Sequence, residues 1–118
     1  MSDALSWADA SAACQAAGLQ LASVQSAAQN ALLVAAAAGN EVWIGGTDAA
    51  SEDAWVWSPS NTPLSYTNWA GGEPSNSGGA EHCLEFILDW VHRVDWIPGQ
   101  WNDDSCDRLK KYVCQQPN

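Results

Sequence analysis

Two groups of acidic and amide side chains flank Cys83, and these are the residues of the chain best suited to chemistry. Glu73 and Glu81 precede the cysteine, and Asn102 and Asp103 follow it. They offer only oxygen ligands, and calcium takes about six to eight oxygens from carboxylates, amide carbonyls and water. Magnesium fits less well because it requires a stricter octahedron. The residues therefore favour calcium, although acids scattered over loops are more commonly just solvated.

The cysteines indicate disulfides rather than a metal or redox site. None of Cys14, Cys83, Cys106 and Cys114 lies in a C-x-x-C pair, which argues against a zinc ribbon or a thioredoxin-type site. An even number in a short chain indicates two disulfides, with three pairings open, and a secreted, periplasmic or cell-surface location. The alternative is four reduced core cysteines in a cytosolic protein. A bridge from Cys83 to Cys106 would bring Glu81 close to Asp103.

No residue pattern in the chain points to catalysis. His82 and His92 are the only histidines, and neither belongs to a recognised motif with a nucleophile. A Ser-His-Asp triad is recognised by geometry rather than by order, and nothing in the sequence supports one. Two glycine pairs, at 71–72 and 78–79, are typical of turns rather than of a phosphate-binding loop. We therefore expect a binding protein and not an enzyme.

Length and charge narrow the range of partners. The 118 residues suit one domain, 1–118, and the formal net charge of −10 argues against nucleic acid and anionic membrane surfaces. No apolar run reaches the roughly 18 residues of a membrane span. Met1-Ser2-Asp3 does not resemble a signal peptide, so we expect a mature or trimmed form of the protein.

The spacing of apolar residues predicts two helices followed by short strands. Ser6 is a cap for a first helix that ends at Gly18, and Ser26 and Gln29 have capping-box spacing for a second that ends at Gly39. Strands are predicted at 42–44, 54–58, 83–88 and 111–115. The segment 58–80 is rich in Ser, Asn, Gly and Pro and predicts a long ordered loop. The predicted fold class is α+β.

Several short motifs occur along the chain in an order that resembles the C-type lectin domain family. The resemblance runs from Ser6 to Gln115, and as a set the motifs are specific, although each alone is weak. They are Trp43-Ile44-Gly45, Asn68-Trp69, Glu73-Pro74, Glu81-x-Cys83, Trp101-Asn102-Asp103 and Cys106, with the outer cysteines Cys14 and Cys114.

This resemblance implies a C-type lectin-like fold with disulfides Cys14–Cys114 and Cys83–Cys106 and a cis peptide before Pro74. It also implies a non-enzymatic, calcium-dependent sugar-binding function, in which two adjacent sugar hydroxyls become calcium ligands. The calcium ligands that it implies are Glu73, Ser75, Glu81, Asn102 and Asp103. Binding at one shallow site is expected to be weak, so avidity would come from multivalency, for instance in a homo-oligomer.

The chain departs from the family pattern at position 75, and this bears on the sugar. Mannose-type members read Glu-Pro-Asn and galactose-type members Gln-Pro-Asp, whereas this chain reads Glu73-Pro74-Ser75. The connection Asp89–Gln100 is also longer than usual and contains Trp96, which could stack on a galactose-like ring or simply pack on the loop. We expect galactose-type sugars slightly ahead of mannose or fucose. The sugar-binding residues would be Glu73, Ser75, Glu81, Asn102 and Trp96.

Many relatives hold a second calcium ion, and part of that ligand set is present here. The matching residues are Asp48, Glu52, Asn76 and Glu81. His82 stands where an acid is common, so a filled and an empty second calcium site are equally expected. If the site is empty, Asp48 and Glu52 belong to a solvated turn.

Two rival functions use the same fold. One is protein recognition through the Asp89–Gln100 insertion, and the other is ice binding, which the sparse threonines disfavour. Relatives also pair a first strand with the C-terminal strand, and no obvious strand precedes Ser6. We expect either a trimmed chain or a terminal sheet that closes differently, for example with a neighbouring copy.

Overall fold

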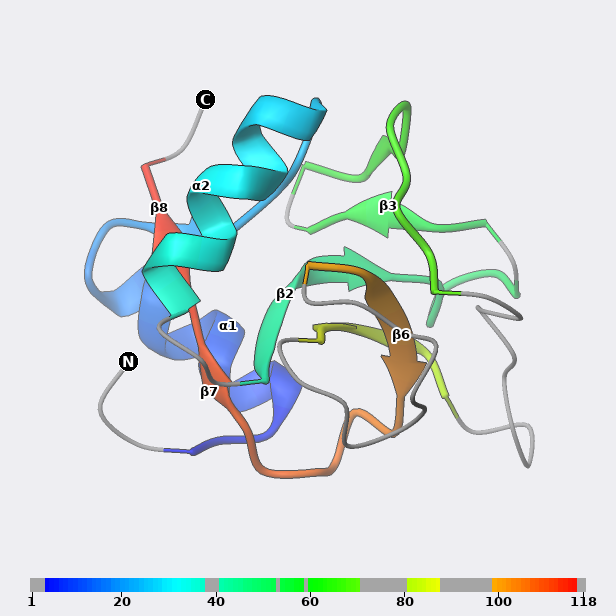
Figure 1. Cartoon of the computed structure of the whole chain (residues 1–118). Coiled ribbons are helices and arrows are strands. Elements are labelled where there is room, and N and C mark those ends of the chain that lie inside the picture. Colours follow the sequence, from blue (N-terminus) through cyan, green and yellow to red (C-terminus); the bar gives the residue numbers. More distant parts are fainter. Residues whose placement is uncertain are drawn as a thin grey trace.

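Two helices and eight short strands make up the described part of this computed structural model, which covers residues 4–37, 41–52, 54–58, 60–70, 81–87 and 99–116. Figure 1 shows their arrangement. In chain order they are α1 (Trp7–Ala16), β1 (Gln20–Leu21), α2 (Ala27–Ala37), β2 (Val42–Thr47), β3 (Val56–Trp57), β4 (Thr62–Pro63), β5 (Cys83–Phe86), β6 (Trp101–Asp104), β7 (Lys111–Tyr112) and β8 (Cys114–Gln115).

Local capping sets the ends of α1 as predicted. The Ser6 hydroxyl accepts a hydrogen bond from the backbone N–H of Asp9, satisfying one of the free donors of the first turn. Gly18 follows the helix with a φ of 78°, a left-handed conformation that costs glycine little. Ala10 and Cys14, one turn apart, are the buried residues of the helix.

Helix α2 begins where the capping pattern predicts, with one difference. The Ser26 hydroxyl accepts from the backbone N–H of Gln29, at 3.2 Å. The side-chain oxygen of Gln29 accepts a hydrogen bond from the backbone N–H of Gln25, at 2.6 Å, and not from that of Ser26 as a capping box would have it. The predicted stop at Gly39 lies outside the described residues.

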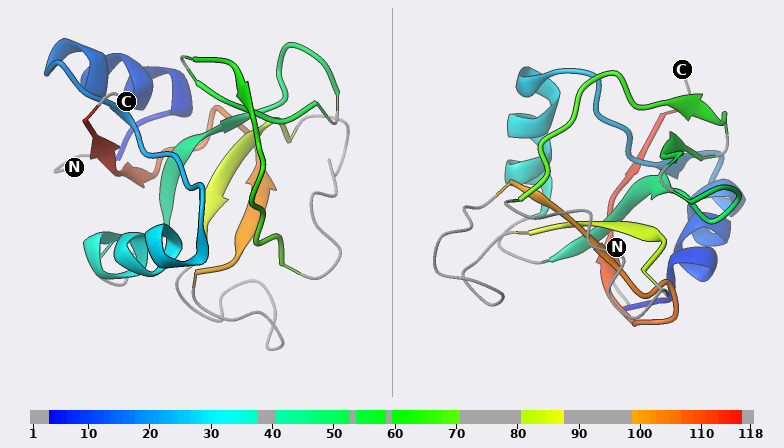
Figure 2. Two further views of the ribbon diagram at one scale, coloured as in Figure 1. Left: turned by 90° about the horizontal axis from the view of Figure 1, so that it is seen from above. Right: turned by 90° about the vertical axis from the view of Figure 1, so that its right-hand side faces the viewer.

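The main sheet has the order β4-β3-β2-β5-β6, with antiparallel neighbours, and β7 pairs parallel to β2. A separate antiparallel pair joins β1 to β8. In both views of Figure 2, β2 runs between the two helices. The two helices and the largely antiparallel strands confirm the predicted α+β fold class.

The predicted strands exist, but their bounds differ. Strand β2 continues past Ile44 to Thr47, the segment 54–58 contributes only Val56–Trp57, and the 111–115 segment divides at Val113. Strand β5 ends at Phe86, and residue 88 lies outside the described part. Strands β1, β4 and β6 were not predicted. In β6 the reason is plain: Asn and Asp are poor strand formers, and tertiary contacts override their preference.

Among the described residues, the segment before α1 pairs with the C-terminal part of the chain at one residue. Leu5 and Lys110 form an isolated antiparallel bridge with backbone bonds of 2.8 and 2.9 Å. The indole N–H of Trp43 reinforces this bridge by donating to the Leu5 carbonyl at 3.0 Å.

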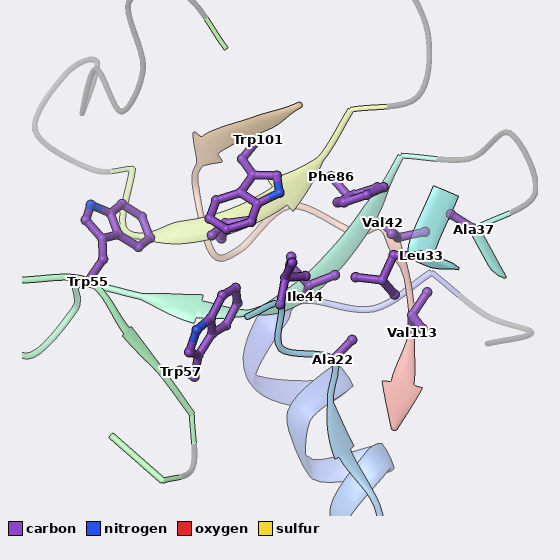
Figure 3. Close-up of a cluster of buried hydrophobic side chains, with 12 residues drawn as sticks. Ala22, Leu33, Ala37, Val42, Ile44, Trp55, Trp57, Phe86, Trp101 and Val113 are labelled. Carbon is purple, nitrogen blue, oxygen red and sulfur yellow. The ribbon is translucent and has the colours of Figure 1, made fainter. Parts of the chain in front are cut away.

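Both faces of β2 are buried, which gives the protein two hydrophobic clusters. Val42 and Ile44 join a cluster with α2 residues and four tryptophan rings, drawn in part in Figure 3. Trp43, which points to the opposite face, joins Ala10 and Cys14 of α1 in the other cluster. The sheet therefore lies between the two helices.

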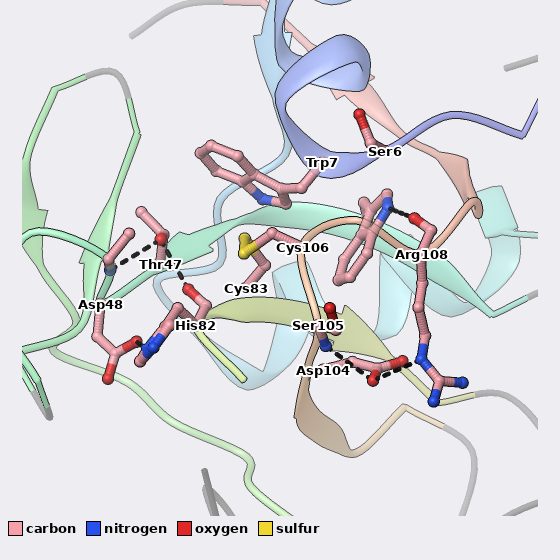
Figure 4. Close-up of a disulfide and its surroundings, with 12 residues drawn as sticks. Ser6, Trp7, Thr47, Asp48, His82, Cys83, Asp104, Ser105, Cys106 and Arg108 are labelled. Carbon is pink, nitrogen blue, oxygen red and sulfur yellow. Dashed lines mark hydrogen bonds and ion pairs between the residues drawn. A yellow bond between two sulfur atoms is a disulfide. The ribbon is translucent and has the colours of Figure 1, made fainter. Parts of the chain in front are cut away.

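Both disulfides implied by the family resemblance are present. Cys14 bonds to Cys114 across 100 residues, and Cys83 bonds to Cys106 across 23. The first joins α1 to β8. The second joins the start of β5 to the segment just after β6, as Figure 4 shows.

Candidate functional site

Strands β5 and β6 form the frame of the predicted calcium site. Their register pairs Leu84 with Asp103 and Glu85 with Asn102. Because side chains alternate along a strand, Asn102 and Asp103 leave β6 on opposite faces. Both are largely buried, with Asn102 7% and Asp103 0% exposed.

Strand β6 is held in place at Trp101, which begins it. The indole N–H donates to the side-chain oxygen of Asn30 on α2 at 2.9 Å, and the Asn30 amide donates to the Gly99 carbonyl, also at 2.9 Å. Three aromatic rings meet the Trp101 ring edge-to-face, those of Trp57, Tyr66 and Trp69, with centroids 5.6–5.9 Å away. The tryptophan before Asn102 thus acts as an anchor for the strand that presents the predicted ligands.

A buried charge network lies on the Asn102 face of these strands. The Asn102 amide donates to Glu85 Oε2 at 2.5 Å, and the Lys110 ammonium lies 3.0 Å from Glu85 Oε1 and 2.9 Å from Asp104 Oδ2. Arg108 also reaches Asp104, at 3.3 Å (Figure 4). The bond to Glu85 fixes the orientation of the Asn102 side chain through its amide nitrogen. The amide oxygen Oδ1 is on the other branch of the same planar group and takes no part in this bond.

Burial strongly affects the titration of this network. Burial raises the pKa of Glu85 to about 7, a hydrogen bond to Glu41 acts in the same direction, and Lys110 opposes them. Burial lowers the pKa of Lys110, but the acids Glu85 and Asp104 outweigh it and the net effect is a raised pKa.

Of the predicted site residues, the structure describes Glu81, Asn102 and Asp103 in the calcium set. In the second set it describes Asp48, Glu52 and the shared Glu81. Glu81 lies two residues before Cys83, whose strand partner is Asp104. The predicted residues Glu73, Ser75, Asn76 and Trp96 lie outside the described residues, as do the Pro74 peptide and residues 89–98 of the insertion.

Asp48 and Glu52 do come together, and His82 lies with them. His82 Nδ1 is 3.0 Å from Asp48 Oδ1 and 3.6 Å from Glu52 Oε1. One ligand atom from each residue can be chosen so that all lie within 4.8 Å of one another. Two of the residues predicted for the second site therefore lie close together, with an imidazole beside them.

Sequence reasoning missed Glu85 and Lys110. A signal for Glu85 was available, because it is a carboxylate inside the apolar run 83–88, where a charge requires a partner. Nothing local identified Lys110 as that partner, since it lies 25 residues further along the chain.

The described residues also outline two pockets, of about 420 and 400 Å³. Both contain Ser23, Gln25 and Gln29, and the first also has Trp57 in its wall. None of their lining residues is a predicted ligand. In the described part of the chain, neither helix has the length and apolar character needed to cross a membrane.

Comparison with known proteins identifies the family. The family described as "Lectin C-type domain" matches residues 3–116. Ladderlectin of Oncorhynchus mykiss is 40% identical over 108 residues, which is 87% of this chain and 53% of that protein. The chain spans about half the length of several curated relatives that it matches.

Solved structures share the fold. The C-type carbohydrate-recognition domain of cow CD23, solved in the presence of a GlcNAc2Man3 oligosaccharide, has a TM-score of 0.82 and 30% identity and covers 98% of this chain and 83% of its own. Herring type II antifreeze protein has a TM-score of 0.83 and 27% identity, covering 98% and 86%. The family is one of non-enzymatic carbohydrate binding, which confirms the prediction that the protein is not an enzyme. The chain, with its two disulfides and its Trp-Asn-Asp strand, belongs to the C-type lectin domain family.

Proposed function

We propose that the protein binds carbohydrate through a calcium ion held at the outer edge of β6. The observation that carries this proposal is the placement of Asn102 and Asp103 on the last strand of the sheet order. The outer edge of β6 is paired at Trp101 by a bridge to Trp69, and beyond that bridge side chains that leave opposite faces of the strand can both fold around the edge toward one ion. In a central strand the neighbouring strand would separate them.

The chemistry of the described residues fits calcium. Glu81 and Asp103 supply carboxylates and Asn102 supplies an amide oxygen, so every donor is an oxygen. Glu85 binds the Asn102 nitrogen and thereby orients the amide. The cations Lys110 and Arg108 pair with Glu85 and Asp104, on the strand face opposite Asp103.

Chain connectivity supports Glu73 and Ser75 as the remaining ligands. The N–H of Ala70 donates to the Trp101 carbonyl at 2.8 Å, one residue from Asn102. Three residues of chain span at most about 11 Å, a length that would allow a carboxylate at position 73 to act at the β6 edge. The chain returns at Glu81, next to the disulfide that joins β5 to the end of β6.

In this site the calcium ion would bind two adjacent sugar hydroxyls. The protein residues around it would complete the hydrogen bonds of those hydroxyls. Glu81 and Glu73 can only accept, whereas Asn102 retains a second N–H to donate beyond the one that it gives Glu85. Each hydroxyl can then both donate and accept.

Galactose-type sugars are slightly favoured over mannose or fucose. Ser75 replaces the asparagine of the mannose-type pattern, and Trp96 offers an aromatic face for the apolar side of a galactose-like ring. The two disulfides suit an extracellular location. A homo-oligomer would supply the avidity that one shallow site lacks. Residues 1–118 are proposed as a single carbohydrate-recognition domain.

The second candidate function is protein recognition through Asp89–Gln100, which is longer than the usual connection of the family. Ice binding is a third, to which the fold similarity with herring antifreeze protein draws attention. Retained calcium ligands favour sugar over both.

Calorimetric titration with calcium, followed by retention on immobilised sugars with and without chelator, tests the proposal. Asp103→Asn should abolish calcium binding and sugar retention. Asp107→Asn, which removes the same charge from an exposed residue, should preserve both. Absence of calcium binding at millimolar concentration would refute the proposal, and calcium binding without sugar retention would favour the protein-recognition function.

Competitive elution with galactose and with mannose tests the preference. Trp96→Ala should weaken galactose binding by about 1–3 kcal/mol if the ring stacks, a scale taken from base–aromatic stacking. Unchanged affinity would remove Trp96 from the site.

A further inference from the structure

Asp48, Glu52 and His82 converge from two segments that are distant in the sequence. Asp48 directly follows β2, Glu52 lies in the turn after it, and His82 directly precedes β5. Figure 4 shows the His82 ring against the Asp48 carboxylate, with Nδ1 and Oδ1 3.0 Å apart. The cluster thus combines one imidazole nitrogen with two carboxylates.

The backbone holds this cluster together independently of its side chains. The carbonyl of His82 accepts two hydrogen bonds, one from the Asp48 N–H at 3.1 Å and one from the Thr47 hydroxyl at 2.7 Å. Thr47 is also the strand partner of Cys83, which the disulfide ties to Cys106. The two ligand-bearing segments are therefore positioned before any ion binds, as a preformed site requires.

The imidazole disfavours the calcium that the family resemblance implies at this place. Calcium takes oxygen ligands, whereas imidazole suits zinc and its first-row neighbours. In a tetrahedral zinc site with bonds of about 2.0–2.2 Å, neighbouring ligand atoms are roughly 3.3–3.6 Å apart. His82 Nδ1 is 3.0 and 3.6 Å from the two carboxylates, and all three ligand atoms lie within 4.8 Å of one another, so side-chain adjustments of about 1 Å would bring them to this spacing.

The three side chains of the cluster differ in their exposure to solvent. The Asp48 side chain is 1% exposed, whereas those of His82 and Glu52 are 31% and 49% exposed. A metal ion can enter from the Glu52 side and reach a carboxylate that is already removed from water. The four cysteines are all in disulfides, so no thiol competes for a soft metal.

We propose that Asp48, Glu52 and His82 bind a zinc-class divalent transition metal, with His82 Nδ1 as the nitrogen ligand and a further position for water or an external ligand. This site is distinct from the proposed calcium site at β6 and does not depend on it. The alternative is a His82–Asp48 ion pair that binds no metal.

Zinc titration by calorimetry, in saturating calcium, tests the proposal on the full chain. One zinc ion should bind per chain, and cobalt in its place should show the visible absorption of a tetrahedral N/O site. His82→Ala should weaken zinc binding by at least about 10–100-fold, the loss that removal of even an outer-shell partner causes. His92→Ala, which removes the other histidine, should leave zinc affinity unchanged.

His82→Asp is the diagnostic variant, because it converts the cluster to oxygen ligands only. It should lose zinc affinity and gain a second calcium ion. Asp103→Asn should abolish calcium and sugar binding without affecting zinc, so failure of one proposal is distinguishable from failure of the other. The zinc proposal is wrong if the native chain binds no zinc, or if correctly folded His82→Ala, checked by circular dichroism, binds zinc as tightly as the native chain.

Discussion

Glu85 is the residue whose environment is most unusual for its type. It is fully buried, yet it contacts both Lys110 and Asn102. A buried carboxylate is costly unless it is paired, and here the pairing includes a residue of the proposed calcium site. Glu85 therefore links the stability of the β5–β6 pair to the orientation of Asn102.

The raised pKa of Glu85 predicts a specific pH dependence of stability. The folded value is about 7 and the ordinary value 4.5. Because the folded pKa is the higher one, the stabilising contribution is complete below pH 4.5 and is lost as the pH rises through 7. Relative to Glu85→Gln, which cannot ionise, the native chain should lose up to about 3 kcal/mol of unfolding free energy across this window. Denaturant unfolding at several pH values measures it.

A second variant, at Glu41, tests what raises the pKa of Glu85. Glu41→Gln removes the acid that hydrogen-bonds to Glu85 and raises its pKa, so the transition should move to lower pH. If native and Glu85→Gln stabilities run parallel across the whole range, the pKa of Glu85 is not raised in the folded protein.

At the scale of elements, the site depends on how α2 holds β6. Asn30 on α2 is buried and forms hydrogen bonds with Trp101, the first residue of β6, and with Gly99, which precedes that strand. The helix contributes no predicted ligand, but it sets the position of the strand that carries two of them.

Asn30→Ala should destabilise the protein by about 1–3 kcal/mol, because it leaves the buried Trp101 indole N–H without its acceptor, whereas the Gly99 carbonyl keeps the bond from the Asn68 amide at 2.8 Å. Thermal or urea unfolding measures the loss. Leu32→Ala on the exposed side of the same helix should change stability by much less. A double-mutant cycle with Trp101→Phe should show coupling between the two residues, and strict additivity would argue against the bond.

The contact between β2 and β5 also leaves no room at Gly46. A Cβ there would lie 2.5 Å from Leu84 Cδ1 and 2.9 Å from Leu84 Cβ. Gly46→Ala should therefore cost about 1–3 kcal/mol as an overpacked core, measured by chemical unfolding. In a Leu84→Ala background the added cost should shrink, and an equal cost in both backgrounds would place the strain elsewhere.

At the scale of the whole molecule, the two disulfides constrain very different lengths of chain. Cys14–Cys114 closes 100 residues and joins α1 to the last strand, whereas Cys83–Cys106 closes 23. The chain-entropy argument gives a greater loss of unfolded-state freedom for the longer loop.

Replacing each pair by serines should therefore destabilise the protein by about 4–5 kcal/mol for Cys14–Cys114 and about 3–4 kcal/mol for Cys83–Cys106. Equilibrium unfolding under non-reducing conditions compares them. The second replacement should additionally weaken calcium binding, because that bridge ties β5 to the end of β6. An equal calcium affinity in both variants would mean that the bridge does not position the site.

Much of this protein was predictable from its sequence, because the relevant signals are local or specific in their order. Ser6, Ser26 and Gly18 act within one helical turn, and the spaced motifs from Trp43 to Cys106 identified the family and its disulfide pairing. The residues proposed to bind calcium were also named from those motifs, and their role stays a prediction.

Only the tertiary structure decided which side chains meet across long stretches of chain. Glu85 contacts Lys110 and Asn30 contacts Trp101 through strand register and burial, which short sequence patterns do not specify. The polar residues of β6 form a strand because the strand pairs with β5 and Trp101 is held by Asn30 and the surrounding aromatic rings. Their own strand preference is low. The family resemblance could likewise name candidate metal-binding positions and the histidine among them, but only the structure showed how closely His82, Asp48 and Glu52 approach one another, because their separation depends on contacts between segments distant in the chain.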